Sequence, residues 1–496
     1  MTDTRRSPGA FVGRARELEE VATLLSAAEA GTGFLLLIRG DAGIGKTRLA
    51  EELGRDATRR GHAVHWGRCV ELAGAPPFWP WVQALRSIAA VPGQLTGASA
   101  AELASVIRLA PELGGADAPG RAAASLAPER DAERFRLFDG IASFLRRVAA
   151  GAPLGIVLDD LHAADLPTLL LLEFVARQLE PGSLWLVGTY RDVEAHADAE
   201  RGRLIARVTR LGRSLSLGGL SAAEANRLIT QSVGQIPEPL ASQIYALTEG
   251  NPFFVDEVAR LLWPRRGDDQ ASSRLPQIAV PSGVREVVRQ RLDPLGPDCL
   301  GILGTAAVIG REVSFALLRE ATGIEPARLL DRLEDAVEAR LLMPQPGRSY
   351  AFGHALIREA LYEQIAASAR SALHRSVGEA IERLYPASLD EHLDELAFHF
   401  GHAAPLADAG KALHYAERAA RRATALLAHE DAVRFYQIAL DALPLLPDEQ
   451  ARARLVDLLL SLGEAQVRAG DTARARAGFE RAAQAARDRG DAHGLA

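Results

Sequence analysis

The 496-residue sequence is poor in cysteine, lysine and long apolar runs. Its two cysteines, Cys69 and Cys299, stand far apart, which excludes a disulfide framework and a cysteine metal site. No aliphatic stretch approaches the ~20 residues that span a bilayer, and the polar N-terminus lacks the apolar core of a signal peptide. We therefore expect a cytoplasmic protein with no membrane partner.

A strong charge of either sign is also missing. The formal net charge is -7, so electrostatics give no reason to expect nucleic acid or an anionic membrane as the main partner. Apolar residues make up 48% of the chain and charged residues 24%, which is ordinary for a soluble protein. At this length, the chain should contain several domains with a core of their own.

Lysine occurs only twice, and one of the two, Lys46, completes a phosphate-binding loop. The segment Gly40–Thr47 reads G-D-A-G-I-G-K-T and satisfies G-x-x-x-x-G-K-[ST] in full. Phe34–Ile38 predicts a buried strand before it, and Arg48–Arg60 predicts a helix after it. Backbone N–H groups would hold the phosphates of ATP or ADP, and the threonine hydroxyl would bind Mg²⁺. We assign nucleotide contacts to Gly40, Ala42, Gly43, Ile44, Gly45, Lys46, Thr47 and Arg48.

A second segment, Gly155–Asp160, reads as an apolar strand that ends in two acids, as a Walker B element does. We expect Asp159 to hold Mg²⁺ through water and Asp160 to act as general base for the attacking water. Another strand-like segment ends at Arg191, where an arginine can reach the γ-phosphate and report its presence. A surface arginine in a βα loop is the alternative. Lys46, Asp160 and Arg191 form the expected catalytic set.

Short apolar runs alternate with helical segments up to residue 217, which predicts a parallel sheet covered by helices in a P-loop NTPase domain over 1–217. The predicted strands are Phe34–Ile38, Ala63–Trp66, Leu154–Leu158, Leu184–Thr189 and Ser214–Leu217. Residues 218–275 predict a helical lid and an exposed linker, with Ser221 as an N-cap and a break at Gly250-Asn251-Pro252.

Two further regions follow the lid. Residues 276–370 contain three runs of apolar residues at helical spacing, the first at 284–292, followed by two short strand-like segments around a turn, which predict a hairpin. Three helices and then a hairpin is the element order of a winged helix. Residues 371–496 are helical throughout and carry small and larger apolar residues at the positions of the tetratricopeptide pattern. The clearest positions are Leu459, Leu462, Gly463, Ala475, Phe479 and Ala482. Because a repeat array normally needs about three units, we expect the natural protein to continue beyond Ala496.

Four motifs in one order carry a family resemblance: Phe11–Glu19, the phosphate loop, Leu158–Asp165 and Gly250–Phe254. They resemble the signal-transduction ATPases with numerous domains, the STAND class. More narrowly, the chain looks like the N-terminal half of large ATP-binding regulators of the LuxR family. The fold class expected is multidomain: an α/β P-loop NTPase with a parallel sheet of AAA type, then a helical lid, a winged helix and all-α tetratricopeptide-like repeats.

The resemblance also implies roles for single residues. Val12 and Gly13 would line the adenine pocket, and Pro252 would pack against the base from the lid. His354 would touch the β-phosphate in the ADP-bound state, although Ala355 replaces the aspartate that often follows this histidine in related ATPases. Packing at a helix start is the alternative for His354.

The leading interpretation is a slow, regulatory ATPase that works as an ADP/ATP-controlled switch in a transcriptional regulator. ADP would keep the domains closed, and ATP plus an inducer, a protein or small ligand bound by the helical repeats, would favour an open form that self-associates.

One alternative is a remodelling or initiator ATPase whose ring neighbours supply Arg207, Arg210 or Arg213. Another is DNA binding through the winged helix. Its third helix carries the acids Glu325, Asp331, Glu334, Asp335 and Glu338, so we expect no direct nucleic-acid binding.

Overall fold

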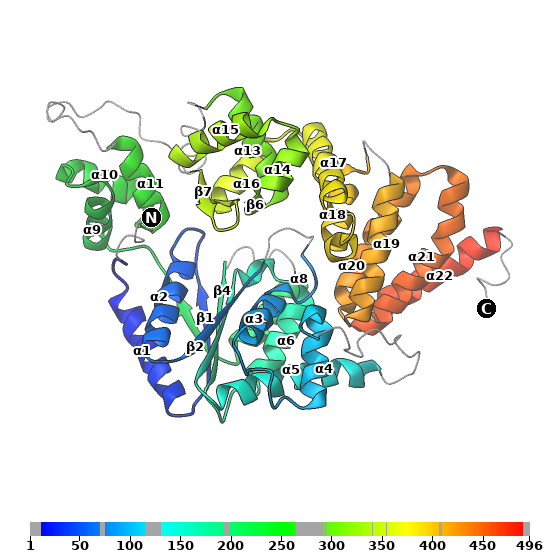
Figure 1. Cartoon of the computed structure of the whole chain (residues 1–496), viewed down its shortest axis with the longest axis horizontal. Helices are drawn as coiled ribbons and strands as arrows, with labels where there is room; N and C mark the ends of the chain where they lie inside the picture. Colours follow the sequence, from blue (N-terminus) through cyan, green and yellow to red (C-terminus); the bar gives the residue numbers. More distant parts are fainter. Residues whose placement is uncertain are drawn as a thin grey trace.

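The structure of the chain is a computed structural model. It describes residues 11–69, 75–114, 130–191, 199–263, 292, 295–339, 341–353, 355–405 and 409–489. Figure 1 shows a sheet with helices on its faces, a small helical lid beside it, a mixed region above it and a row of helices leading to the C-terminus. His354, most of the predicted stripe at 284–292 and the linker to 277 lie outside the described residues.

Five parallel strands form the sheet, in the order β2-β3-β4-β1-β5. They are β1 (Phe34–Arg39), β2 (Ala63–Arg68), β3 (Leu154–Asp159), β4 (Leu184–Tyr190) and β5 (Arg213–Ser216). Each lies within two residues of a predicted strand, so the predicted parallel sheet is confirmed. Because β4 lies between β3 and β1, the segments that carry Gly40, Asp159 and Arg191 meet at one edge.

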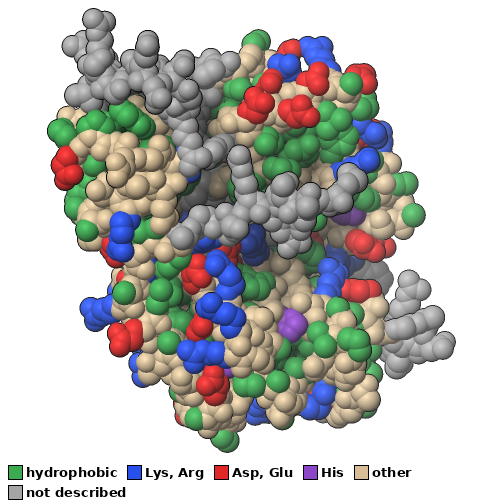
Figure 2. All heavy atoms as spheres, turned by 60° about the vertical axis from the view of Figure 1, so that its left-hand side comes forward, with side chains coloured by type: hydrophobic (Ala, Val, Ile, Leu, Met, Phe, Trp, Pro, Cys, Tyr) green, Lys and Arg blue, Asp and Glu red, His purple; other side chains and the backbone are tan. Residues whose placement is uncertain are grey.

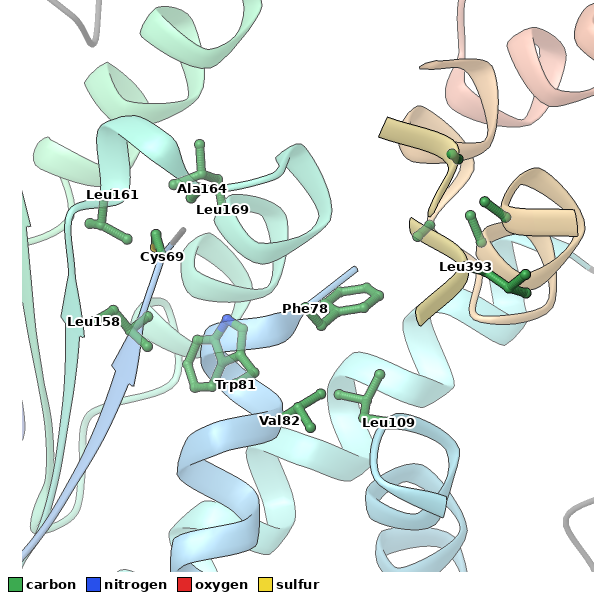
Figure 3. Packing of buried hydrophobic residues seen from close by; sticks show 14 of the residues in the cluster. Cys69, Phe78, Trp81, Val82, Leu109, Leu158, Leu161, Ala164, Leu169 and Leu393 are labelled. Carbon is green, nitrogen blue, oxygen red and sulfur yellow. The ribbon is translucent and has the colours of Figure 1, made fainter. Parts of the chain in front are cut away.

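Helices cover both faces of the sheet, and alternate strand residues point to opposite layers. Leu36 and Ile38 pack toward α1 and α2, whereas Leu35 and Leu37 join the larger cluster on the other face. Figure 3 shows Trp81 and Val82 of α3 in that second layer, with Leu158 of β3 nearby. Burial of each such side chain contributes roughly 1.5–3 kcal/mol. The helices are α1 (Ala15–Glu29), α2 (Lys46–Arg59), α3 (Trp79–Ala89), α4 (Ala100–Leu109), α5 (Arg130–Ala149), α6 (Leu166–Ala176) and α8 (Ala199–Thr209).

The lid consists of α9 (Ala222–Val233), α10 (Glu238–Thr248) and α11 (Pro252–Leu262). Ser221 caps α9 in a reciprocal capping box with Glu224, as its sequence position predicts. The predicted break before Pro252 is confirmed. A second break, between α9 and α10, was not predicted.

The next region, here called the third domain, comprises the described residues between 295 and 364. Its elements are α13 (Pro297–Ile309), β6 (Glu312–Ser314), α14 (Phe315–Thr322), α15 (Pro326–Glu338), β7 (Leu342–Gln345), β8 (Ser349–Phe352) and α16 (Ala355–Gln364). The predicted hairpin is confirmed as the antiparallel pair β7–β8, which β6 extends. Helix α13 was not predicted because it is buried almost all round and so has no apolar stripe.

Helices follow one another through the C-terminal region, as predicted. They are α17 (Ala367–Leu384), α18 (Leu393–Ala403), α19 (Ala409–Ala425), α20 (His429–Ala442), α21 (Asp448–Ala469) and α22 (Thr472–Arg489). A Cβ at Gly463 would come within 2.4 Å of Phe479 Cε1, so this glycine lets α21 and α22 approach closely. Helix α20 also packs against α6 of the sheet domain. Among the described residues, none of the helices is both long enough and apolar enough to cross a membrane.

Candidate nucleotide site

The phosphate loop joins β1 to α2 in a conformation that its glycines permit. Gly43 and Gly45 have φ values of 78° and 101°, in the left-handed region that favours glycine. A Cβ at Gly43 would come within 2.8 Å of Phe253 Cβ, whereas one at Gly45 would meet no described atom within 4 Å. The lid therefore covers one side of the loop, and the start of α2 remains open to an anion.

Lys46 is buried at the centre of this loop. Its Nζ donates to the carbonyl oxygens of Gly40 at 2.9 Å and Asp41 at 2.8 Å. The ammonium is thus held over the loop by the loop's own backbone, where a compact positive charge faces an arriving phosphate.

Thr47 and Asp159 link the phosphate loop to the end of β3. Thr47 Oγ1 lies 3.0 and 3.1 Å from the two carboxylate oxygens of Asp159. Thr189 of β4 donates from Oγ1 to Asp159 Oδ1 at 2.6 Å and accepts from the Asp160 N–H at 2.9 Å. Thr189 therefore fixes both neighbouring acids, a role that the sequence analysis did not assign to it.

The environment of Asp159 suits a hard cation. Its carboxylate is fully buried, and this desolvation raises its pKa, with the charge of Asp160 adding to the rise. The Thr47 hydroxyl and the Asp159 carboxylate are oxygen ligands of the kind that Mg²⁺ takes. Among the described residues, no group of three or more His, Cys, Asp or Glu could hold a metal ion. This is compatible with Mg²⁺ held largely by phosphates and water.

Asp160, the expected general base, is bound by a residue from another domain. Its backbone is left-handed, with φ 62°, and Arg311 Nη1 of the third domain lies 3.1 Å from its Oδ2. Arg311 follows α13 directly. In this arrangement one oxygen of the carboxylate is engaged by a cation from the third domain.

Arg191 is held in the same manner. It is buried beside the phosphate loop, and its Nη1 lies 3.0 Å from Oε1 of Glu359 on α16. The structure thus excludes the alternative of an exposed loop arginine. Two of the three expected catalytic residues are therefore ion-paired to the third domain.

The lid is tied directly to the phosphate loop. Asn251 Nδ2 donates to the carbonyl of Ala42 at 2.9 Å, and its Oδ1 accepts from the N–H of Phe253 at 3.2 Å, capping α11. Arg14 donates to the carbonyls of Ile44 and Gly218 at 3.2 and 2.5 Å. The Gly-Asn-Pro segment is therefore more than a helix break, because its asparagine holds loop and lid together.

A cavity of about 480 Å³ opens in front of the loop, between sheet domain, lid and third domain. Among its lining residues are Val12, Gly43, Ile44, Gly45, Lys46, Thr47, Arg48, Asp160, Arg191, Pro252 and Arg311. Val12 and Pro252 lie in one lining with the loop, and their contact with adenine stays a prediction. Gly13 instead lies against Glu224, which a Cβ would meet at 2.4 Å. Gly40 and Ala42 present their carbonyls to Lys46 and Asn251 and are not lining residues.

In the alternative of a ring-forming ATPase, one of three arginines would reach the nucleotide site of a neighbouring subunit. Arg207 is ion-paired to Glu173 at 2.7 Å. Arg210 and Arg213 are exposed where β5 begins, at the edge of the sheet opposite the phosphate loop. None of the three lies in the lining of the nucleotide cavity of its own chain.

Comparison with known proteins agrees with this geometry. Residues 10–187 match the family model described as "AAA ATPase domain". This part of the chain is similar to AAA ATPase domains and is called the AAA ATPase domain below. A curated relative, an uncharacterized protein of Rhizobium meliloti (strain 1021), is 26% identical over 402 residues. The match covers 76% of this chain, which spans only 38% of the length of that relative.

The chain also has some similarity to solved structures. One is a signal transduction ATPase with numerous domains (STAND) from Pyrococcus horikoshii, which has a tetratricopeptide repeat sensor. It is 15% identical to this chain, with a TM-score of 0.45, and the match covers 99% of this chain and 79% of that protein's chain. Another is the Aeropyrum pernix ORC2 protein, 17% identical with a TM-score of 0.38, covering 76% of this chain and 97% of its own. At such identities and TM-scores, these likenesses say nothing about the activity of this chain.

Proposed function

We propose that this chain is the nucleotide-controlled switch of a STAND-class ATPase, serving as the regulatory part of a transcriptional regulator of LuxR type. ADP holds the AAA ATPase domain, the lid and the third domain together in the closed form. ATP and an inducer favour an open form that self-associates. A ligand can drive such a change only through its different affinity for the two forms.

The observation that carries this proposal is the pair of ion pairs between the AAA ATPase domain and the third domain. Arg311 engages Asp160 at 3.1 Å, and Glu359 engages Arg191 at 3.0 Å. Both catalytic candidates are thus occupied by partners that a movement of one domain would remove together. The proposed switch requires both ion pairs to break when the third domain moves.

Hydrolysis in this arrangement should be slow. A general base must lie within hydrogen-bond reach of the proton that it removes, and Asp160 is instead bound to a guanidinium. Mg²⁺, when bound at Thr47 and Asp159, would neutralise charge on the phosphates. Lys46 would orient the β- and γ-phosphates, and Arg191, once released from Glu359, would contact the γ-phosphate.

The remaining parts have supporting roles in the proposal. Helices α13, α14 and α15 and the hairpin of the third domain act as a winged helix that closes the site rather than binding DNA. Helices α19 to α22 act as tetratricopeptide-like repeats that receive the inducer. Small buried residues such as Ala475 and Ala482 support close pairing of these helices.

The nucleotide content and turnover of the isolated chain test this proposal. Freshly purified protein, extracted with acid and analysed by chromatography, should release ADP. Its ATP hydrolysis should be slow and independent of protein concentration. Brisk turnover would contradict the closed switch. Turnover that rises with protein concentration would instead favour the remodelling or initiator ATPase, in which neighbouring subunits complete each other's sites.

A further inference from the structure

A second and larger cavity lies between the AAA ATPase domain, the third domain and the C-terminal helices. Its volume is about 1260 Å³. Its walls come from β2 and α3, from β6 and α14, and from α17 to α19. Figure 2 shows several Lys and Arg side chains along the seam between the AAA ATPase domain and the parts above it. We call this space the inter-domain cavity.

The inter-domain cavity and the nucleotide cavity share two residues, Asp160 and Arg311. These are the two partners of the ion pair that holds the third domain on the catalytic edge. Arg311 is 36% exposed in its side chain, so the guanidinium is reachable although it is paired. A ligand in the inter-domain cavity can therefore act on the general base without entering the nucleotide cavity.

The lining of the inter-domain cavity combines apolar side chains with an accessible cation, Arg68, in the same lining as the Asp160–Arg311 ion pair. Trp79, Val82, Leu317 and Phe398 supply part of the apolar wall. Arg68, at the end of β2, is 40% exposed, and its nearest carboxylate oxygens, on Asp159 and Glu312, lie 3.8 and 4.0 Å away.

The distances from Arg68 to its two neighbouring carboxylates leave its guanidinium able to bind an added anion. Both distances exceed those of an ordinary hydrogen bond, so the planar fork can still bind an anion in bidentate fashion. Four other cations of the described lining have closer partners: Arg86 pairs with Glu112, Arg418 with Asp390, Arg421 with Glu417 at 3.5 Å and Arg422 with Asp394 at 3.6 Å. Of these five arginines, Arg68 is the most loosely paired, and it lines the same cavity as Arg311.

We propose that the inter-domain cavity is an effector site for an amphipathic anion, a small molecule with an apolar body and a single carboxylate, sulfonate or phosphate group. The apolar body lies against Trp79 and Leu317, and the anionic group binds Arg68 and competes with Asp160 for Arg311. Binding by itself requires only the cavity; its effect on the nucleotide site rests on the switch proposed above.

Two fluorescent probes test the binding. 8-Anilinonaphthalene-1-sulfonate carries the anion, and N-phenyl-1-naphthylamine is the same ring system without it. Arg68→Met removes the guanidinium but keeps apolar volume, and Ser314→Phe fills the cavity. Arg59→Met on α2, at a position 74% exposed, is the matched control. Thermal unfolding confirms that each variant is folded.

Wild-type protein should bind about one sulfonate probe per chain. Arg68→Met should weaken that probe roughly tenfold, the loss of about 1.4 kcal/mol expected for one charge-assisted contact, and leave the neutral probe unchanged. Ser314→Phe should weaken both probes, and Arg59→Met neither. Equal binding of the sulfonate probe to wild type and Arg68→Met, or uptake that never saturates, would overturn the proposal.

Calorimetry with ADP separates this inference from the switch. A saturating sulfonate probe should change the ADP dissociation constant of the wild type, and much less that of Arg311→Met, because coupling between two sites is reciprocal. Normal ADP binding with no Arg68-dependent probe binding would refute the effector site alone. Arg68-dependent probe binding without ADP binding would refute the switch and support the site.

Discussion

Arg311, which immediately precedes β6, donates a hydrogen bond to Asp160, which immediately follows β3 and lies 151 positions earlier in the sequence. The two atoms lie 3.1 Å apart, and the carboxylate belongs to the residue expected to activate water. In the proposed switch, this contact lets the third domain control hydrolysis. The predictions below follow from it and from the packing that supports it.

Removing the guanidinium should activate the enzyme. Arg311→Ala frees Asp160 and is expected to raise basal ATP hydrolysis severalfold, measured as phosphate release at saturating ATP. The matched control is Arg328→Ala, which breaks the exposed pair with Asp298 in the same domain and should leave the rate unchanged. A fall in rate for Arg311→Ala would mean that this arginine assists the chemistry instead of restraining it.

Asp160→Asn should separate binding from hydrolysis. The amide keeps the size of the side chain but cannot act as a base, so ATP should still bind with near wild-type affinity while turnover falls by roughly 10²–10⁴-fold. Calorimetry gives the affinity, and phosphate release gives the rate. Hydrolysis at the wild-type rate would remove Asp160 from the catalytic set.

Stability should fall as the pH rises toward alkaline values because of two acids beside α6. Burial raises the pKa of Asp394 to about 7 and that of Asp431 to about 8. Nearby arginines oppose this rise: Arg422 and Arg434 lower the pKa of Asp394, and Arg434 lowers that of Asp431. An acid whose folded pKa is raised stabilises the fold fully below its unfolded value, near 4, and this stability is lost as the pH rises through the folded pKa.

Asp394→Asn should therefore flatten the decline in the free energy of unfolding between pH 6 and pH 8, measured by urea denaturation. The control, Asp390→Asn, changes a side chain that is 80% exposed and should leave the slope as in the wild type. His374 and His399 act in the opposite direction. Burial lowers their pKa values to about 2 and about 3, so they favour folding above pH ~6.5 and oppose it in acid. Parallel curves for wild type and Asp394→Asn would contradict the assignment.

Gly463→Ala should destabilise the pairing of α21 and α22. The new Cβ would lie 2.4 Å from Phe479 Cε1, and overpacking of this kind costs about 1–3 kcal/mol. Gly301→Ala on α13 is the matched control, since its Cβ would meet no described atom within 4 Å. That change should stabilise by about 0.5–1 kcal/mol through helix propensity. If both variants unfold at the same denaturant concentration, α21 and α22 do not pack as described.

The sequence was sufficient for features that depend on short segments. Buried parallel strands are continuous apolar runs, so β1, β3 and β4 could be located from residues such as Leu36 and Val157 alone. The phosphate loop and the paired acids are local motifs with fixed spacing. Ser221 could be identified as an N-cap because a cap is defined by the few residues that follow it.

The features that were missed depend on contacts between distant segments. Helix α13 is buried along most of its length and gives no periodic stripe. Arg311 and Glu359 carry no local motif, and their partners lie 151 and 168 positions away. In a chain this rich in arginine, composition does not distinguish these two from any other surface charge.

Calorimetric titration of nucleotide-stripped, folded protein with ADP and ATP in the presence of Mg²⁺ tests the central claim most directly. The account predicts that both nucleotides bind, ADP more tightly because it favours the closed form, and that Lys46→Ala abolishes both. Folded wild-type protein that takes up neither nucleotide, or a Lys46→Ala variant that binds as well as the wild type, would contradict it.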